Sequence, residues 1–99
     1  MLLTGKCKED FDFWLRTEMY YLGKEDLSEL FWNALIFKFF DDKNMVISIK
    51  SKYGFRKKKH VFQFEFNNYK SEFMQSREVA TYQAIIVANS TYNNRFNNN

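Results

Sequence analysis

The chain has 99 residues, a single cysteine and a formal net charge of +3 at pH 7. This length fits one domain, and one cysteine excludes an internal disulfide. The sequence shows no secretory signal and no apolar run long enough to cross a membrane, so we expect a cytoplasmic protein without a membrane partner. Aromatic residues make up 20% of the chain, and because they bury large areas, this short chain can still form a substantial core.

Two helices are predicted in the N-terminal third. Thr4 suits an N-cap, and apolar residues then recur at helical spacing as far as Leu22, so the first helix is expected over residues 5–22. Gly23 suits the left-handed position that follows a helix. A second, shorter helix with one apolar stripe is expected over residues 25–32.

A hairpin is predicted next. Residues 34–40 are rich in strand-favouring side chains and precede the turn-forming run Asp41–Asn44, so we expect a strand there. Residues 45–53 alternate between apolar and basic, which predicts a second strand with one core face. Two registers of this hairpin remain possible. A four-residue loop would pair Phe40 with Met45, whereas a five-residue loop would put Phe37 and Phe39 on the same face as Met45.

The segment after the basic run alternates strictly, with Phe62, Phe64 and Phe66 on one face, and this period predicts a half-buried strand. Asn67 and Asn68 suit a two-residue turn, since Asn tolerates positive φ. Such a turn sets three facing pairs, Phe66 with Tyr69, Phe64 with Ser71 and Phe62 with Phe73. The apolar phases of the two strands then agree, which favours an antiparallel meander.

The C-terminal segment is predicted to be a helix of about four turns that begins after an N-cap at Ser76. Regularly spaced alanines form a narrow stripe for close packing on a sheet. No charged residue occurs over residues 79–94, so a second apolar face remains for the N-terminal helices or a partner to cover, and a homodimer through this 79–94 helix is one such arrangement. The alternative is a strand over residues 82–88, which are rich in β-branched side chains.

The predicted fold class is therefore α+β. Two N-terminal helices precede an antiparallel β-meander of three to four strands, and a C-terminal helix packs on the sheet. Residues 1–92 form the single domain, and the Asn-rich residues 93–99 are predicted to be a flexible tail because they show no apolar periodicity.

Charge is distributed unevenly. Residues 1–31 hold four Lys and Arg against seven Asp and Glu, a net −3, and residues 32–99 hold eleven against five, a net +6. Six of those eleven fall within positions 50–59, interleaved with aromatic residues. The candidate partner-binding residues are Lys50, Lys52, Tyr53, Phe55, Arg56, Lys57, Lys58, Lys59 and His60.

This mixture favours single-stranded nucleic acid, because cations meet phosphates while aromatic rings stack on bases. It would also attract an acidic protein face. The simpler interpretation is a solvated hairpin tip that keeps the protein soluble and blocks edge pairing.

Catalytic chemistry is not predicted. The chain has one histidine and no HxH, CxxC, HExxH or glycine-rich phosphate motif, so we expect no enzyme activity, no metal site and no cofactor. His60 beside Lys59 could serve in acid–base chemistry, but a lone histidine at a strand end is more often a surface or stacking residue. Cys7 has periodic apolar neighbours and is expected to be buried. Asp41 and Asp42 could ligate a cation but suit a turn equally well.

Three stretches of the sequence carry a resemblance. The first is the opening run from Leu3 to Phe11, LTGKCKEDF. The second, Phe39-Phe40-Asp41, is the weakest of the three. The third consists of Arg77, Ala80, Ala84, Ile85, Ala88, Asn89, Tyr92, Asn93, Asn94 and Arg95. In these residues the chain resembles a family of small proteins encoded by bacterial phages and prophages. The resemblance implies a phage accessory protein in the bacterial cytosol, and such proteins commonly bind and disable host defence machinery, including CRISPR effectors.

Three functions are therefore considered. The first is a phage-derived inhibitor that uses the basic hairpin to bind a host nuclease or ribonucleoprotein, or its guide RNA, for example an anti-CRISPR protein against an RNA-targeting effector. The second is a general RNA- or DNA-binding module. The order helix, three strands, helix is that of double-stranded-RNA-binding domains, although only Arg77 stands where those domains carry a basic motif. The third is a structural or oligomeric phage component.

Overall fold

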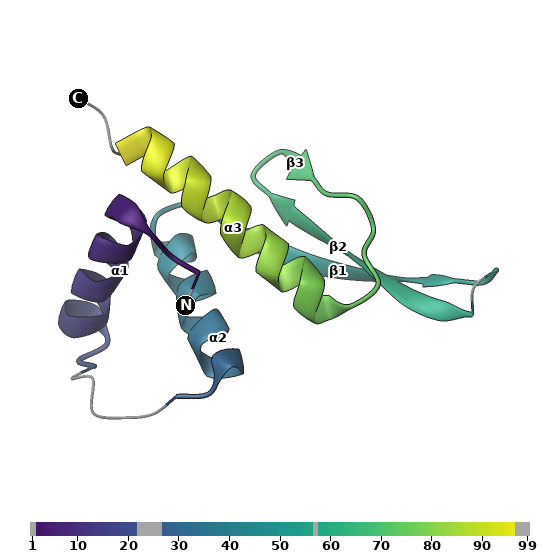
Figure 1. Ribbon diagram of the computed structural model, residues 1–99, viewed down its shortest axis with the longest axis horizontal. Coiled ribbons are helices and arrows are strands. Elements are labelled where there is room, and N and C mark those ends of the chain that lie inside the picture. Colours follow the sequence, from purple (N-terminus) through teal and green to yellow (C-terminus); the bar gives the residue numbers. More distant parts are fainter. Residues whose placement is uncertain (1, 22–26, 57, 97–99) are drawn as a thin grey trace.

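The structure is a computed structural model that describes residues 2–21, 27–56 and 58–96. Over these residues the chain forms three helices and one antiparallel sheet with strand order β1-β2-β3. The elements are α1 (Gly5–Glu18), α2 (Glu29–Asp42), β1 (Ile47–Gly54), β2 (Lys59–Phe66), β3 (Tyr69–Lys70) and α3 (Arg77–Phe96). Helix α3 lies between the sheet and the two N-terminal helices, and it contacts β1 and β2 as well as α1 and α2 (Figure 1). The β1–β2 hairpin extends beyond the helices (Figure 1). The predicted α+β class and the helix packed on the sheet are confirmed.

Helix α1 is shorter than the predicted range of 5–22. It ends at Glu18, and the chain reverses at Tyr20, whose φ is +54°. The Tyr21 N–H donates to the Leu15 carbonyl at 2.9 Å, so this turn closes the helix end in the way a glycine usually does. The residue predicted for that role, Gly23, lies outside the described residues.

Helix α2 replaces both the helix predicted over 25–32 and the strand predicted over 34–40. It begins after Ser28, whose Oγ accepts the Phe31 N–H at 3.2 Å, and runs to Asp42. Its buried side chains are Leu35, Ile36, Phe39 and Phe40. This spacing fills one face of a helix, whereas a strand would turn half of these side chains to solvent, so burial overrides strand propensity.

Because 34–40 is helical, the predicted hairpin between it and residues 45–53 does not form, and neither of its two registers applies. The helix instead ends in a turn at Asn44, whose φ is +60°. The Met45 N–H donates to the Phe40 carbonyl at 2.8 Å, and Met45 is fully buried. This turn therefore connects the end of α2 directly to the start of β1.

The β1–β2 pairing follows the predicted alternation. Ile49 pairs with Phe64 and Ile47 with Phe66, and these side chains face α3. The last pair is Gly54 with Lys59, so four residues form the connecting turn. The opposite face of the sheet carries Ser48, Lys50, Lys52, Lys59, Val61, Gln63 and Glu65.

The second hairpin agrees with the prediction for two pairs and departs at the third. Phe66 pairs with Tyr69, and the Ser71 N–H donates to the Phe64 carbonyl at 3.0 Å. Phe62 then pairs with Met74 rather than with Phe73. One extra residue is therefore accommodated between the strands, as in a β-bulge, and it turns Phe73 out to solvent, where 50% of it is exposed.

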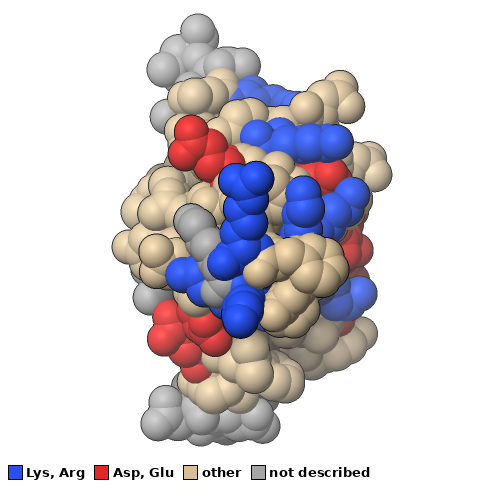
Figure 2. All heavy atoms as spheres, turned by 90° about the vertical axis from the view of Figure 1, so that its right-hand side faces the viewer, with Lys and Arg blue, Asp and Glu red and all other residues tan. Residues whose placement is uncertain are grey.

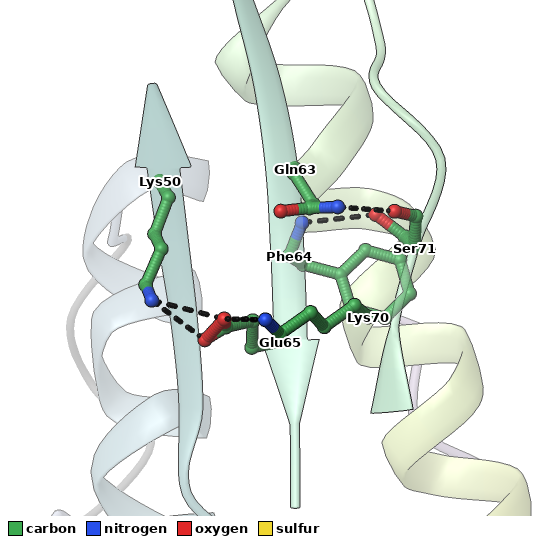
Figure 3. Close-up of polar contacts among 6 residues, drawn as sticks. All are labelled: Lys50, Gln63, Phe64, Glu65, Lys70 and Ser71. Atoms are coloured by element: carbon green, nitrogen blue, oxygen red, sulfur yellow. Dashed lines mark hydrogen bonds and ion pairs between the residues drawn. The ribbon is translucent and has the colours of Figure 1, made fainter. Parts of the chain in front are cut away.

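Ser71 explains why the extra residue is tolerated (Figure 3). Its Oγ accepts the Phe64 N–H at 3.0 Å, where a regular ladder would use the Ser71 carbonyl. That carbonyl accepts instead from Gln63 Nε2 at 2.7 Å. The Phe64 N–H and the Ser71 carbonyl, which a regular ladder would join to each other, therefore each keep a hydrogen-bond partner.

Helix α3 begins after Ser76, whose Oγ accepts the Val79 N–H at 3.1 Å, as predicted. Ala80, Ala84 and Ala88 are fully buried, and the strand alternative over 82–88 is wrong. The helix continues through Asn93 to Phe96, so this part of the predicted flexible tail is helical, and residues 97–99 lie outside the described residues.

The N-terminus is held against the end of α3. Asn93 Oδ1 accepts the Cys7 N–H at 2.7 Å, and Asn93 Nδ2 donates to the Thr4 carbonyl at 3.0 Å. Between them lies Gly5 at φ +61°, where an added Cβ would lie 3.1 Å from the Asn93 side chain. The positive φ favours a glycine there, and any side chain would also displace the Asn93 amide by a few tenths of an ångström.

Candidate functional site

The candidate residues lie at the free end of the β1–β2 hairpin. Figure 2 looks onto this end of the molecule and shows Lys and Arg side chains gathered around its centre. Of the nine predicted residues, the structure describes eight, and Lys57 lies outside the described residues. The turn contains Phe55, Arg56 and Lys58, and Lys58 adopts a φ of +51° at the position that leads back into β2.

The strand register separates the predicted residues onto two faces of the hairpin. Tyr53 pairs with His60, so both side chains lie on the face that α3 covers further along the sheet. Lys50, Lys52 and Lys59 lie on the opposite, open face. The sequence interleaves aromatic and basic residues, and the fold sorts them into an aromatic side and a basic side.

The aromatic side is a cluster of three rings, Tyr53, Phe55 and His60. The Tyr53 and Phe55 centroids are 5.3 Å apart with perpendicular planes, and the Tyr53 and His60 centroids are 5.2 Å apart. Phe55 is 84% exposed and Tyr53 is 41% exposed. The cluster therefore belongs to the surface and offers ring faces to a partner.

The cations differ in how far they are already neutralised. Lys50 Nζ lies 2.9 Å from a carboxylate oxygen of Glu65, and Lys70 Nζ lies 3.9 Å from the other oxygen (Figure 3). The Lys50 hydrogen bond holds the pKa of Glu65 below its ordinary value. Lys50 is thus the least available of the predicted cations.

Four described cations nearer the tip form no ion pair with any other described residue, and they are Lys52, Arg56, Lys58 and Lys59. All four are exposed. Because these positive charges repel one another, an anion that binds at the free end of the hairpin is stabilised electrostatically.

Phe73 joins this surface although the sequence interpretation placed it in the core. Lys52 Nζ lies 5.7 Å from the centroid of the Phe73 ring, over the open face of the sheet. The bulge after Ser71 puts the ring there, and no signal in the sequence marks that bulge.

Other candidate groups have structural roles. Cys7 is fully buried, and burial together with the Asp10 carboxylate raises the pKa of its thiol to about 12. Such a thiol is neither a nucleophile nor a metal ligand near neutral pH. Asp42 accepts the Trp14 indole N–H at 2.9 Å and so ties α2 to α1. Within residues 2–21, 27–56 and 58–96, no three His, Cys, Asp or Glu side chains are grouped to hold a metal ion.

Comparison with known proteins found no matching family model, no similar curated protein and no similar solved structure. Among the described helices, none combines the length and the apolar character that a membrane span requires. The hairpin end combines exposed aromatic rings with cations that form no ion pair with another described residue, and this chemistry supports a functional proposal.

Proposed function

We propose that this chain is an RNA-binding accessory protein whose hairpin end binds single-stranded RNA. The observation that carries the proposal is the placement of Phe55, a ring 84% exposed on the turn between unpaired cations. An exposed phenylalanine on a turn contributes nothing to the core, whereas it provides a stacking surface for a base.

The two faces of the hairpin suit the two parts of a nucleotide. Bases would stack on the cluster of Tyr53, Phe55 and His60, and phosphates would meet Arg56, Lys58 and Lys59 at the turn and on the open face. A single strand can follow such a narrow ribbon from one face to the other because its unstacked bases rotate freely. A duplex is too stiff to do so, which favours single-stranded RNA.

The biological setting that we propose is the one implied by the family resemblance. The RNA would be the guide of a host defence ribonucleoprotein, such as an RNA-targeting CRISPR effector, and the protein would inhibit that effector. The projection of the hairpin beyond the helices supports this setting, because a narrow extension can enter a channel that already holds RNA (Figure 1).

Fluorescence anisotropy with labelled oligo(U), measured over a series of salt concentrations, tests the proposal. The double variant Arg56→Ser, Lys58→Ser should bind more weakly. The slope of log K against log salt should fall in magnitude by about 1.4, because each phosphate contact with a single strand contributes about 0.7. A double-stranded competitor of the same length should displace oligo(U) poorly.

The matched control is Arg16→Ser, Lys38→Ser, which removes the same charges from exposed sites on α1 and α2. It should retain the parent's affinity and salt slope. Equal losses in the two double variants would mean that net charge alone governs binding, and no affinity of the parent for oligo(U) would overturn the proposal. In a cleavage assay with an RNA-guided effector, inhibition should be lost in the hairpin variant and kept in the control.

A further inference from the structure

A groove of about 700 Å³ lies away from the hairpin end, between the first turns of α2 and α3. The apolar side chains that line it are Leu30 of α2, Val79 and Tyr82 of α3, and Leu2, which precedes α1. Leu30 is 81% exposed, and Val79 and Tyr82 are about half exposed. The second apolar face expected for the C-terminal helix is thus left open by α1 and α2. Grouped apolar side chains of this kind mark an interaction surface.

Two carboxylates, those of Glu29 and Glu78, line the groove. Glu29 begins α2 and Glu78 lies in the first turn of α3, and neither forms an ion pair with a described residue. The remaining charged residue there is Arg77, whose guanidinium lies over the Phe62 ring, 5.0 Å from its centroid. The groove therefore suits an apolar side chain flanked by cations.

The chain itself carries such a segment. Phe55 projects from the hairpin turn with Arg56 on one side in the sequence and unpaired lysines close by. An aromatic ring that fills an apolar pocket while flanking charges meet carboxylates is the usual form of an interface anchor. The hairpin extends away from α2, so its end cannot reach the groove of its own chain (Figure 1).

We propose that the hairpin end of one copy docks in the groove between α2 and α3 of a second copy. Phe55 enters between Leu30 and Tyr82, and the tip cations meet Glu29 and Glu78. The contact is heterologous, since the two copies contribute different surfaces, and it therefore builds a ring or an open chain of subunits. RNA and a second copy compete for the same hairpin end, so RNA binding disperses the assembly.

Sedimentation velocity of nuclease-treated protein, over a range of protein and salt concentrations, tests the contact. The parent should show a concentration-dependent species larger than the monomer, and high salt should reduce it. The groove variant Glu29→Lys, Glu78→Lys and the tip variant Arg56→Glu, Lys58→Glu should each be monomeric alone. A mixture of the two should associate, because the groove variant keeps an intact hairpin and the tip variant keeps an intact groove.

The control Glu18→Lys, Glu72→Lys makes the same charge change at exposed sites away from the groove and should assemble like the parent. Leu30→Ser should lose the larger species. At protein concentrations where the parent is monomeric, its melting temperature should equal that of the parent, since the side chain is exposed. A monomeric parent at every concentration, or a mixture that stays monomeric, would overturn the proposal.

RNA binding is measured separately and does not decide this test. The groove variant should bind oligo(U) at least as tightly as the parent does, because its hairpin is unaltered and no second copy competes for it. An assembly that forms although oligo(U) fails to bind would support the tip-to-groove contact and refute the proposed RNA function, and the opposite pair of results would do the reverse.

Discussion

The Tyr92 hydroxyl donates a 2.5 Å hydrogen bond to Asp10 Oδ2, which joins α3 to α1 across 82 residues of sequence. Burial alone would raise the pKa of Asp10, but the hydrogen bonds from Tyr92 and Lys6 outweigh it and hold the pKa below its ordinary 3.8. Burial and the Asp10 carboxylate together raise the pKa of Tyr92. The fold therefore favours an ionised Asp10 beside a protonated Tyr92.

We expect the Asp10→Asn variant to be less sensitive to acid than the parent. A carboxyl group whose pKa is lowered by folding stabilises the fold above its unfolded pKa near 3.8, and this stabilisation is lost as the pH falls through the lower folded pKa. Asparagine does not titrate, so the free energy of unfolding should fall less steeply in that window. Urea denaturation from pH 7 downward measures both slopes, and equal slopes would contradict the role of Asp10.

Phe64→Ala should lower the free energy of unfolding by about 3–5 kcal/mol, because the ring is only 2% exposed and its removal leaves a cavity in the core. Phe73→Ala is the matched control. The sequence pattern puts both rings on the core face, whereas the bulge leaves Phe73 half exposed, so its loss should cost less than about 1 kcal/mol. Thermal and urea denaturation of both variants distinguish the two registers, and similar costs would favour the unbulged pairing.

Asn93→Ala should destabilise the protein, although the residue lies in the segment that the sequence predicts to be a tail. The change leaves the Cys7 N–H and the Thr4 carbonyl without their partner, and an orphaned group of this kind costs about 1–3 kcal/mol when water cannot replace the bond. Asn94→Ala, on the exposed side of the same turn, should change stability little. A deficit no larger than that of Asn94→Ala would show that the N-terminus is not held by this side chain.

The parts of the fold that the sequence predicts are those in which periodicity and burial agree. The alternation of Phe62, Phe64 and Phe66 identifies β2, and Ser76 marks the start of α3, because each signal is local. Residues 34–40 mislead because their strand-favouring side chains form a helix, α2, whose apolar face packs against α1, α3 and β1. The strand propensity of these side chains contributes less free energy than the burial of that face of the helix.

Long-range partners explain the other differences. Asn93 is held in the fold by hydrogen bonds to Cys7 and Thr4, which precede it in the sequence by 86 and 89 positions, and no local sequence pattern predicts these contacts. The Ser71 hydroxyl replaces a ladder bond and so permits a bulge that alternation cannot reveal. The basic run lies at the end of a hairpin, as the sequence predicts, but the separation of the rings from the lysines depends on the register of Tyr53 with His60.

Phe55→Ala should leave stability unchanged within about 0.5 kcal/mol, because a side chain that is 84% exposed contributes little packing. Its effect on binding should be larger. If a base stacks on this ring, oligo(U) affinity should fall by about 1–3 kcal/mol while the salt slope stays that of the parent, since no phosphate contact is removed. Phe13→Ala removes an equally large ring that is 60% exposed on α1, and it should leave oligo(U) binding intact. Unchanged affinity in Phe55→Ala, together with a reduced slope in Arg56→Ser, Lys58→Ser, would mean that RNA contacts the cations and not the rings.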